Sequence, residues 1–173
     1  MSFRIPVLAA ALACAFTACA PALDWRLVRP EDGAIEALFP CKPKSQARTV
    51  ALAGNPVYML MYACTAAGRT YALTFAELGD PARVTPALRE MRTAASTNIG
   101  GTETLATALQ VSGMTPNPAA QRVDIKGQLP DGAVVWQQAG FFVRGTRVYQ
   151  ASIVGSSPDA EAADSFFAGL KLL

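Results

Sequence analysis

Cys41 and Cys64 are the first candidates for chemistry in this chain, because their two thiols can form a disulfide. A bridge between positions 41 and 64, 23 apart, would stabilise the fold by about 3 kcal/mol through loop closure. A redox-active pair is the alternative, but that chemistry favours Cys-x-x-Cys spacing, which this pair lacks. We therefore predict a structural disulfide in an oxidising compartment.

The chain contains few residues suited to catalysis. It contains no histidine, so the commonest general base and every Ser-His or Cys-His pair are excluded. Asp159, Glu161 and Asp164 lie close in sequence, but the dipole of a helix that starts there explains them without a metal. No phosphate-binding loop pattern occurs. The sequence predicts no catalytic residue, metal or cofactor, and a protein that is not an enzyme.

Aromatic side chains are the main candidates for a ligand site. Tyr62, Trp136 and Tyr149, with Tyr58, are expected either to line a pocket between sheet and helix or to pack in the core. Loops carry function on rigid scaffolds, so the segment 113–119 is the predicted partner-facing segment.

The first 19 residues predict export. Arg4 precedes an apolar run over residues 5–16, which is too short for a membrane anchor and typical of a secretory signal. The segment ending at Cys19 resembles a bacterial lipoprotein signal, which implies a signal peptide over 1–18, a lipidated Cys19 and a tether over 19–24. Cleavage at Ala18-Cys19-Ala20 or Ala13-Cys14-Ala15 would instead release a soluble periplasmic protein. Resemblance to the enteric sorting pattern, with Ala20 in place of Asp, implies the outer membrane.

Composition predicts one globular domain over residues 25–173. The formal net charge is only +2, and the charges are scattered, so there is no electrostatic footprint for nucleic acid.

Periodicity and turn signals place the elements that would position these residues. Alternating or apolar runs bounded by Gly, Pro and Asn predict strands over 25–28, 34–39, 46–52, 57–64, 70–77, 121–129, 133–143 and 146–154. The run 57–64, apolar on both faces, predicts a central strand covered on both sides. Thr85 and Gly100 are the expected N-cap and stop of a helix, 103–109 has the composition of a second, shorter helix, and a last helix follows Ser157-Pro158. Residues 113–118 form a loop.

This order predicts an α+β fold, an antiparallel sheet of about six strands flanked by helices. Phe39-Pro40, Tyr58 and Tyr71, and the C-terminal stretch 147–170 with Phe166-Phe167 make the chain similar to the PsbP/Mog1-like superfamily. The resemblance implies an α-β-α sandwich. More closely, the segment 39–43 (FPCKP) resembles uncharacterised lipoproteins of β-proteobacteria. The superfamily includes photosystem assembly factors and a small-GTPase regulator, and none of its binding residues matches a position here.

Together these observations predict a lipoprotein on the periplasmic face of a bacterial envelope, held to the membrane by its N-terminal lipid. The expected role is to bind or help assemble another envelope protein. The alternative is a periplasmic module that binds a small ligand in an aromatic-lined pocket.

Overall fold

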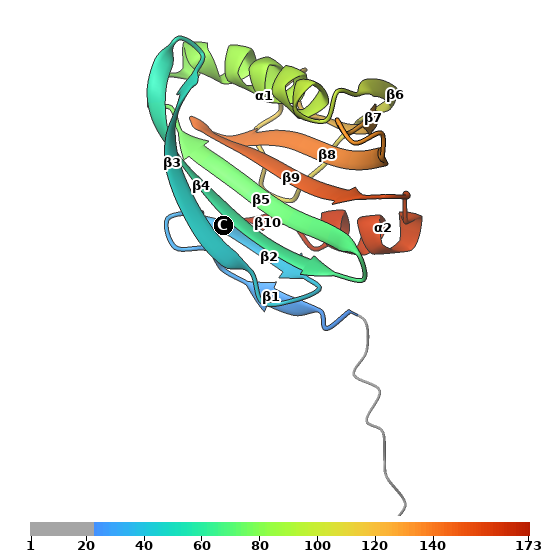
Figure 1. The fold of residues 1–173 in the computed structure, drawn as a ribbon. Helices are drawn as coiled ribbons and strands as arrows, with labels where there is room; N and C mark the ends of the chain where they lie inside the picture. The colour runs from blue at the N-terminus through green and yellow to red at the C-terminus, as the bar shows by residue number, and fades with distance from the viewer. Residues whose placement is uncertain (1–22) are drawn as a thin grey trace, which may run out of the picture.

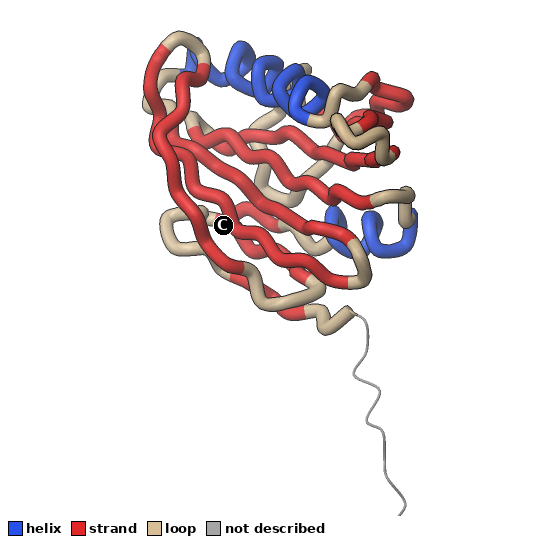
Figure 2. Tube along the Cα trace, in the orientation of Figure 1, coloured by secondary structure: helices blue, strands red, loops and turns tan. Residues whose placement is uncertain are grey.

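The computed structural model describes residues 23–173 and is dominated by strands (Figure 1, Figure 2). A short 3₁₀ helix, η1, covers Pro81–Arg83. The two α-helices are α1 (Val84–Asn98) and α2 (Ala160–Ala168). The strands are β1 (Arg26–Val28), β2 (Ile35–Phe39), β3 (Lys44–Leu52), β4 (Asn55–Ala66), β5 (Arg69–Glu77), β6 (Thr102–Ala108), β7 (Gln121–Gln128), β8 (Val134–Arg144), β9 (Arg147–Gly155) and β10 (Lys171–Leu172).

Seven strands form one antiparallel sheet in the order β3-β4-β5-β9-β8-β7-β6. Two meanders make up this sheet, and the pairing of β5 with β9 joins them at its centre. Helix α1 carries the chain from β5 to β6 between the two meanders. The hairpins at Ala53-Gly54 and Ala67-Gly68 have two central residues with positive φ, the turn geometry that matches strand twist.

The two faces of this sheet cover different cores. Side chains alternate along each strand, so Tyr71, Leu73 and Phe75 of β5 enter one cluster and Ala76 enters the other. The Ala76 face packs under α1, whose buried stripe is Val84, Ala87, Leu88, Met91 and Ala95. The opposite face packs against α2 and the small sheet. In Figure 1, α1 runs along the top of the large sheet, and α2 lies at the lower right of the view.

The small sheet has the order β1-β2-β10 and lies against the large sheet together with α2. Phe166 of α2 contacts both Phe39 and Tyr71 edge to face, with ring centroids 5.4 and 5.5 Å apart. Such aromatic pairs add to the free energy gained by burying apolar area. The first and last described strands therefore close one side of the domain.

The structure is consistent with the predicted α+β class, but it corrects several finer predictions. The segment 103–109 is not a helix, because Thr102–Ala108 forms the edge strand β6 paired with β7. Thr85 is not the N-cap: Asp80 caps the preceding 3₁₀ turn, and α1 begins at Val84. The large sheet has seven strands rather than about six, and three more form the small sheet.

The strand predicted over 57–64 is present as β4, but it is neither central nor fully covered. Strand β4 lies next to β3, which is the edge strand of the large sheet. Val57 and Met59 are buried, whereas Leu60 to Cys64 are only half-buried. The apolar side chains on both faces of β4 are therefore not all covered by other elements. Part of this strand borders an open groove.

Candidate functional site

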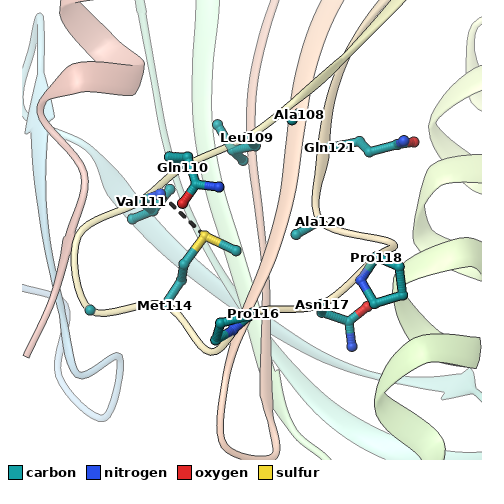
Figure 3. Close-up of a pocket in the computed structure, with 11 residues that line it drawn as sticks. Ala108, Leu109, Gln110, Val111, Met114, Pro116, Asn117, Pro118, Ala120 and Gln121 are labelled. Atoms are coloured by element: carbon teal, nitrogen blue, oxygen red, sulfur yellow. Dashed lines mark hydrogen bonds between the residues drawn. The ribbon is translucent and has the colours of Figure 1, made fainter.

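A cavity lies inside the segment that joins β6 to β7 (Figure 3). Its volume is about 630 Å³, within the range of small-ligand pockets. We call it the loop cavity. Its lining comes entirely from one stretch of chain and consists of Ala108, Leu109, Gln110, Val111, Gly113, Met114, Pro116, Asn117, Pro118, Ala120 and Gln121.

Hydrogen bonds to three other elements fix the loop around this cavity. The Thr115 N–H donates to the carbonyl oxygen of Val143 at 2.8 Å, and the Thr115 hydroxyl oxygen accepts from the Gly145 N–H at 2.9 Å. The Asn117 amide Nδ2 donates to the Thr85 hydroxyl oxygen at the start of α1, at 3.0 Å. The Ser112 carbonyl oxygen accepts from the Leu172 N–H of β10. These contacts explain how a long connection without regular structure keeps one shape.

Local turns give the loop its internal form. The Val111 N–H donates to the sulfur of Met114, and the Met114 N–H donates back to the Val111 carbonyl oxygen (Figure 3). Gly113 has a φ of +82°, and a Cβ there would lie 2.7 Å from the Leu172 carbonyl oxygen. Only glycine combines that backbone conformation with such a close approach. The Asn117 side-chain oxygen accepts from the Ala119 N–H and closes the second turn.

The lining of the loop cavity favours binding over covalent or acid–base chemistry. Gln110, Asn117 and Gln121 offer amide donors and acceptors, while Leu109, Val111 and Met114 offer apolar surface, and no lining side chain carries a charge. Such a lining can bind a peptide or other neutral group by hydrogen bonds and apolar contact. It has no group suited to acting as a general base or nucleophile.

The three aromatic residues predicted to line a pocket do not meet at one cavity. Tyr149 is fully buried: its ring stacks on Phe142 and its hydroxyl donates to the Gly33 carbonyl oxygen at 2.9 Å. Burial is the main cause that raises the pKa of the Tyr149 hydroxyl, so this group stays neutral. Tyr149 therefore follows the core-packing alternative.

Tyr62 and Trp136 lie at separate places on the large sheet. Tyr62 is half-buried on β4 and stacks on Phe75, with ring centroids 6.2 Å apart. Trp136 is half-buried near the start of β8, and the Lys126 ammonium group lies 5.2 Å from its ring centroid. Neither side chain lines the loop cavity.

The predicted disulfide is confirmed. Cys41 and Cys64 are bonded, with their Cα atoms 6.0 Å apart, and join the segment before β3 to the far end of β4. The bridge lies away from the loop cavity in sequence and shares no lining residue with it. Cys19 and the predicted signal peptide fall outside the described residues.

The loop was predictable from the sequence, whereas the residues that frame the cavity were not. The Gly, Pro and Asn residues of 113–118 predicted a loop, which is confirmed. Leu109, Val111 and Ala120 carried no such signal, because their role depends on packing against distant strands and helices. Among residues 23–173, no helix is both long and apolar enough to cross a membrane.

No family model matches the chain, and no curated protein matches it. A crystal structure of a protein of unknown function from Pseudomonas aeruginosa, described as a putative regulator, has a TM-score of 0.41 and 12% sequence identity. That match covers 81% of this chain and 88% of the other. A likeness of this degree says nothing about what this chain does.

Proposed function

We propose that this protein is a non-enzymatic envelope lipoprotein that binds another envelope protein through the loop cavity. In this proposal Cys19 carries the lipid, and the domain from residue 25 onward is held at the periplasmic face of the outer membrane. The domain would have the α-β-α sandwich of the PsbP/Mog1-like superfamily. The position of α1 on one face of the large sheet, and of α2 with the small sheet on the other, supports that assignment.

The observation that carries the binding role is the rigid frame of the loop cavity. A loop that is already ordered loses little conformational entropy when a partner docks, so it binds more tightly than a flexible one. The hydrogen bonds from Thr115 and Asn117 to distant elements provide this order. The exposed side chains of Gln110, Pro116 and Pro118 border the cavity and are accessible to a partner.

Site-specific crosslinking in the native host tests the binding role. A photo-reactive amino acid replaces Gln110 at the loop cavity, and a matched variant carries it at exposed Thr65, at the far end of β4. We expect a discrete crosslinked product from position 110 and none from position 65. The same pattern from both positions, or none from 110, would contradict the proposal.

A second variant shows whether the shape of the loop matters. Asn117→Ala removes the hydrogen bonds to the Thr85 hydroxyl and the Ala119 N–H, each contributing about 1 kcal/mol. The large core clusters do not include Asn117, so the domain should remain folded. We expect the crosslink from position 110 to weaken in this variant while its unfolding transition stays cooperative.

The tether is tested separately by the intact mass of the protein extracted from host membranes. A diacyl or triacyl mass on a chain that begins at Cys19 is expected. An unlipidated chain in the soluble fraction would refute the tether and favour the small-ligand alternative. That alternative would have to use a site other than the three aromatic residues, because they do not share a cavity.

A further inference from the structure

A second cavity lies where helix α1 leaves part of the large sheet uncovered. Its volume is about 270 Å³, and α1 forms one wall while β3 and β4 form the other. Thr74, Gln150 and Ser152 come from the central strands β5 and β9. A smaller cavity of about 190 Å³ shares Met59 and Met61 with it. We call the two together the methionine groove.

Methionine is concentrated in this groove. Of the four methionines among residues 23–173, Met59, Met61 and Met91 all line it, and Met114 belongs to the loop cavity. Met59 and Met61 alternate on one face of β4, about 7 Å apart along the strand. Met91 faces them from α1. Three flexible thioether side chains therefore border one space from two elements.

Core packing accounts for only part of this arrangement. Met59 and Met91 are 8% and 4% exposed and belong to the core cluster under α1. Met61 is half-buried and does not belong to either core cluster, yet it borders both cavities of the groove. Met61 is therefore less tightly packed than Met59 and Met91 and stands at the open side of the groove.

Thioether sulfur is a soft, uncharged ligand that selects Cu(I) over hard divalent cations. The two charged side chains that line the larger cavity, Arg48 and Glu90, have opposite signs and leave it without net charge. Cys41 and Cys64 are joined to one another, so the structural disulfide offers no competing thiolate. Met61 is half-buried, whereas Met59 and Met91 are buried, so the three thioether side chains reach from the open side of the groove to its interior.

We propose that Met59, Met61 and Met91 form a binding site for a soft monovalent metal ion, Cu(I). Binding involves no change in oxidation state: the three sulfurs donate lone pairs, and no proton is released. The site is independent of the proposed partner-binding role, because the methionine groove and the loop cavity share no residue.

The test uses the full chain with Cys14→Ser and Cys19→Ser and with the Cys41–Cys64 bridge formed. Cu(I) is added without oxygen, and Ag(I) serves as a redox-stable substitute. Metal retained after gel filtration gives the stoichiometry, and labelled methionine ε-methyl groups report by NMR which sulfurs bind. Met61→Leu is the main variant, and Met114→Leu is its matched control outside the groove.

We expect one metal ion per chain, and shifted ε-methyl signals for Met59, Met61 and Met91 but not for Met114. Met61→Leu should lose the bound metal, whereas Met114→Leu should retain it. Leucine is close to methionine in volume, and such exchanges cost less than about 1.5 kcal/mol, so both variants should fold. No bound metal, or equal binding by Met61→Leu and the unchanged chain, would overturn the proposal and leave the groove as an apolar surface.

Discussion

Replacing Arg83 with methionine should destabilise the domain by about 3 kcal/mol. The Arg83 guanidinium donates three hydrogen bonds to backbone carbonyl oxygens, at 2.7 Å to Leu52, 3.1 Å to Leu78 and 3.2 Å to Ala53. Together they join the turn between β3 and β4 to the segment before α1. Each intramolecular hydrogen bond contributes about 1 kcal/mol net, and methionine preserves most of the apolar stem.

Urea unfolding followed by circular dichroism measures this cost. Arg89→Met is the matched control, because the Arg89 side chain is exposed on α1 and makes no hydrogen bond or ion pair with residues 23–173. The control should change the free energy of unfolding by less than about 0.5 kcal/mol. If Arg83→Met costs no more than Arg89→Met, water replaces the three hydrogen bonds without loss and the reasoning is refuted.

Three other variants test separate features of the fold. Replacing Cys41 and Cys64 together with alanine should lower the free energy of unfolding by about 3 kcal/mol, since the bridge closes a separation of 23 residues; an unchanged urea midpoint would contradict this. Ala67→Asn should stabilise the chain by about 0.5–1 kcal/mol, because Ala67 has a φ of +48° and asparagine tolerates that conformation; thermal unfolding measures the gain, and a lower melting temperature would count against it. Glu103→Gln should destabilise the domain at neutral pH but not in acid. The hydrogen bond from Arg92 is the largest cause that holds the pKa of Glu103 below its usual value of 4.5, ahead of burial, which opposes it. The ion pair is therefore fully stabilising above pH 4.5 and is lost as the pH falls through the lowered pKa, so urea midpoints of the two chains should converge there; a constant difference down to that pH would refute the linkage.

Strong alternation made most of the large sheet predictable from the sequence. Tyr71, Leu73 and Phe75 share one face as their spacing indicated, and the hairpin at Ala67-Gly68 lies where the turn signal placed it. The C-terminal helix also follows its apolar pattern, since Phe166 and Phe167 are buried. Local pattern was sufficient in these cases because each element buries its own periodic face.

The sequence-based predictions were wrong where contacts with distant residues outweigh the local conformational preference of a segment. The strand β6 has alanine, leucine and glutamate, which favour a helix in isolation, but pairing with β7 supplies its backbone hydrogen bonds along one edge. Burial of Tyr149 depends on Gly33, 116 positions away, which accepts its hydroxyl hydrogen bond. No short-range signal distinguishes Tyr149 from half-buried Tyr62, so the aromatic residues could not be assigned to core or pocket from the sequence.

Incomplete coverage of the large sheet has a consequence for how the two candidate sites can be studied. Helix α1 has 15 residues and buries its stripe over one part of the sheet, so a second part, beside Met61, stays half-open. The loop cavity is fixed instead from the start of α1, through Thr85 and Asn117. One helix thus contributes to both sites at different points along its length. Because Met91 and Thr85 lie six residues apart on that helix, a variant that shifts α1 as a whole would disturb both sites. Met61→Leu and Asn117→Ala change side chains outside the helix and therefore separate metal binding from partner binding.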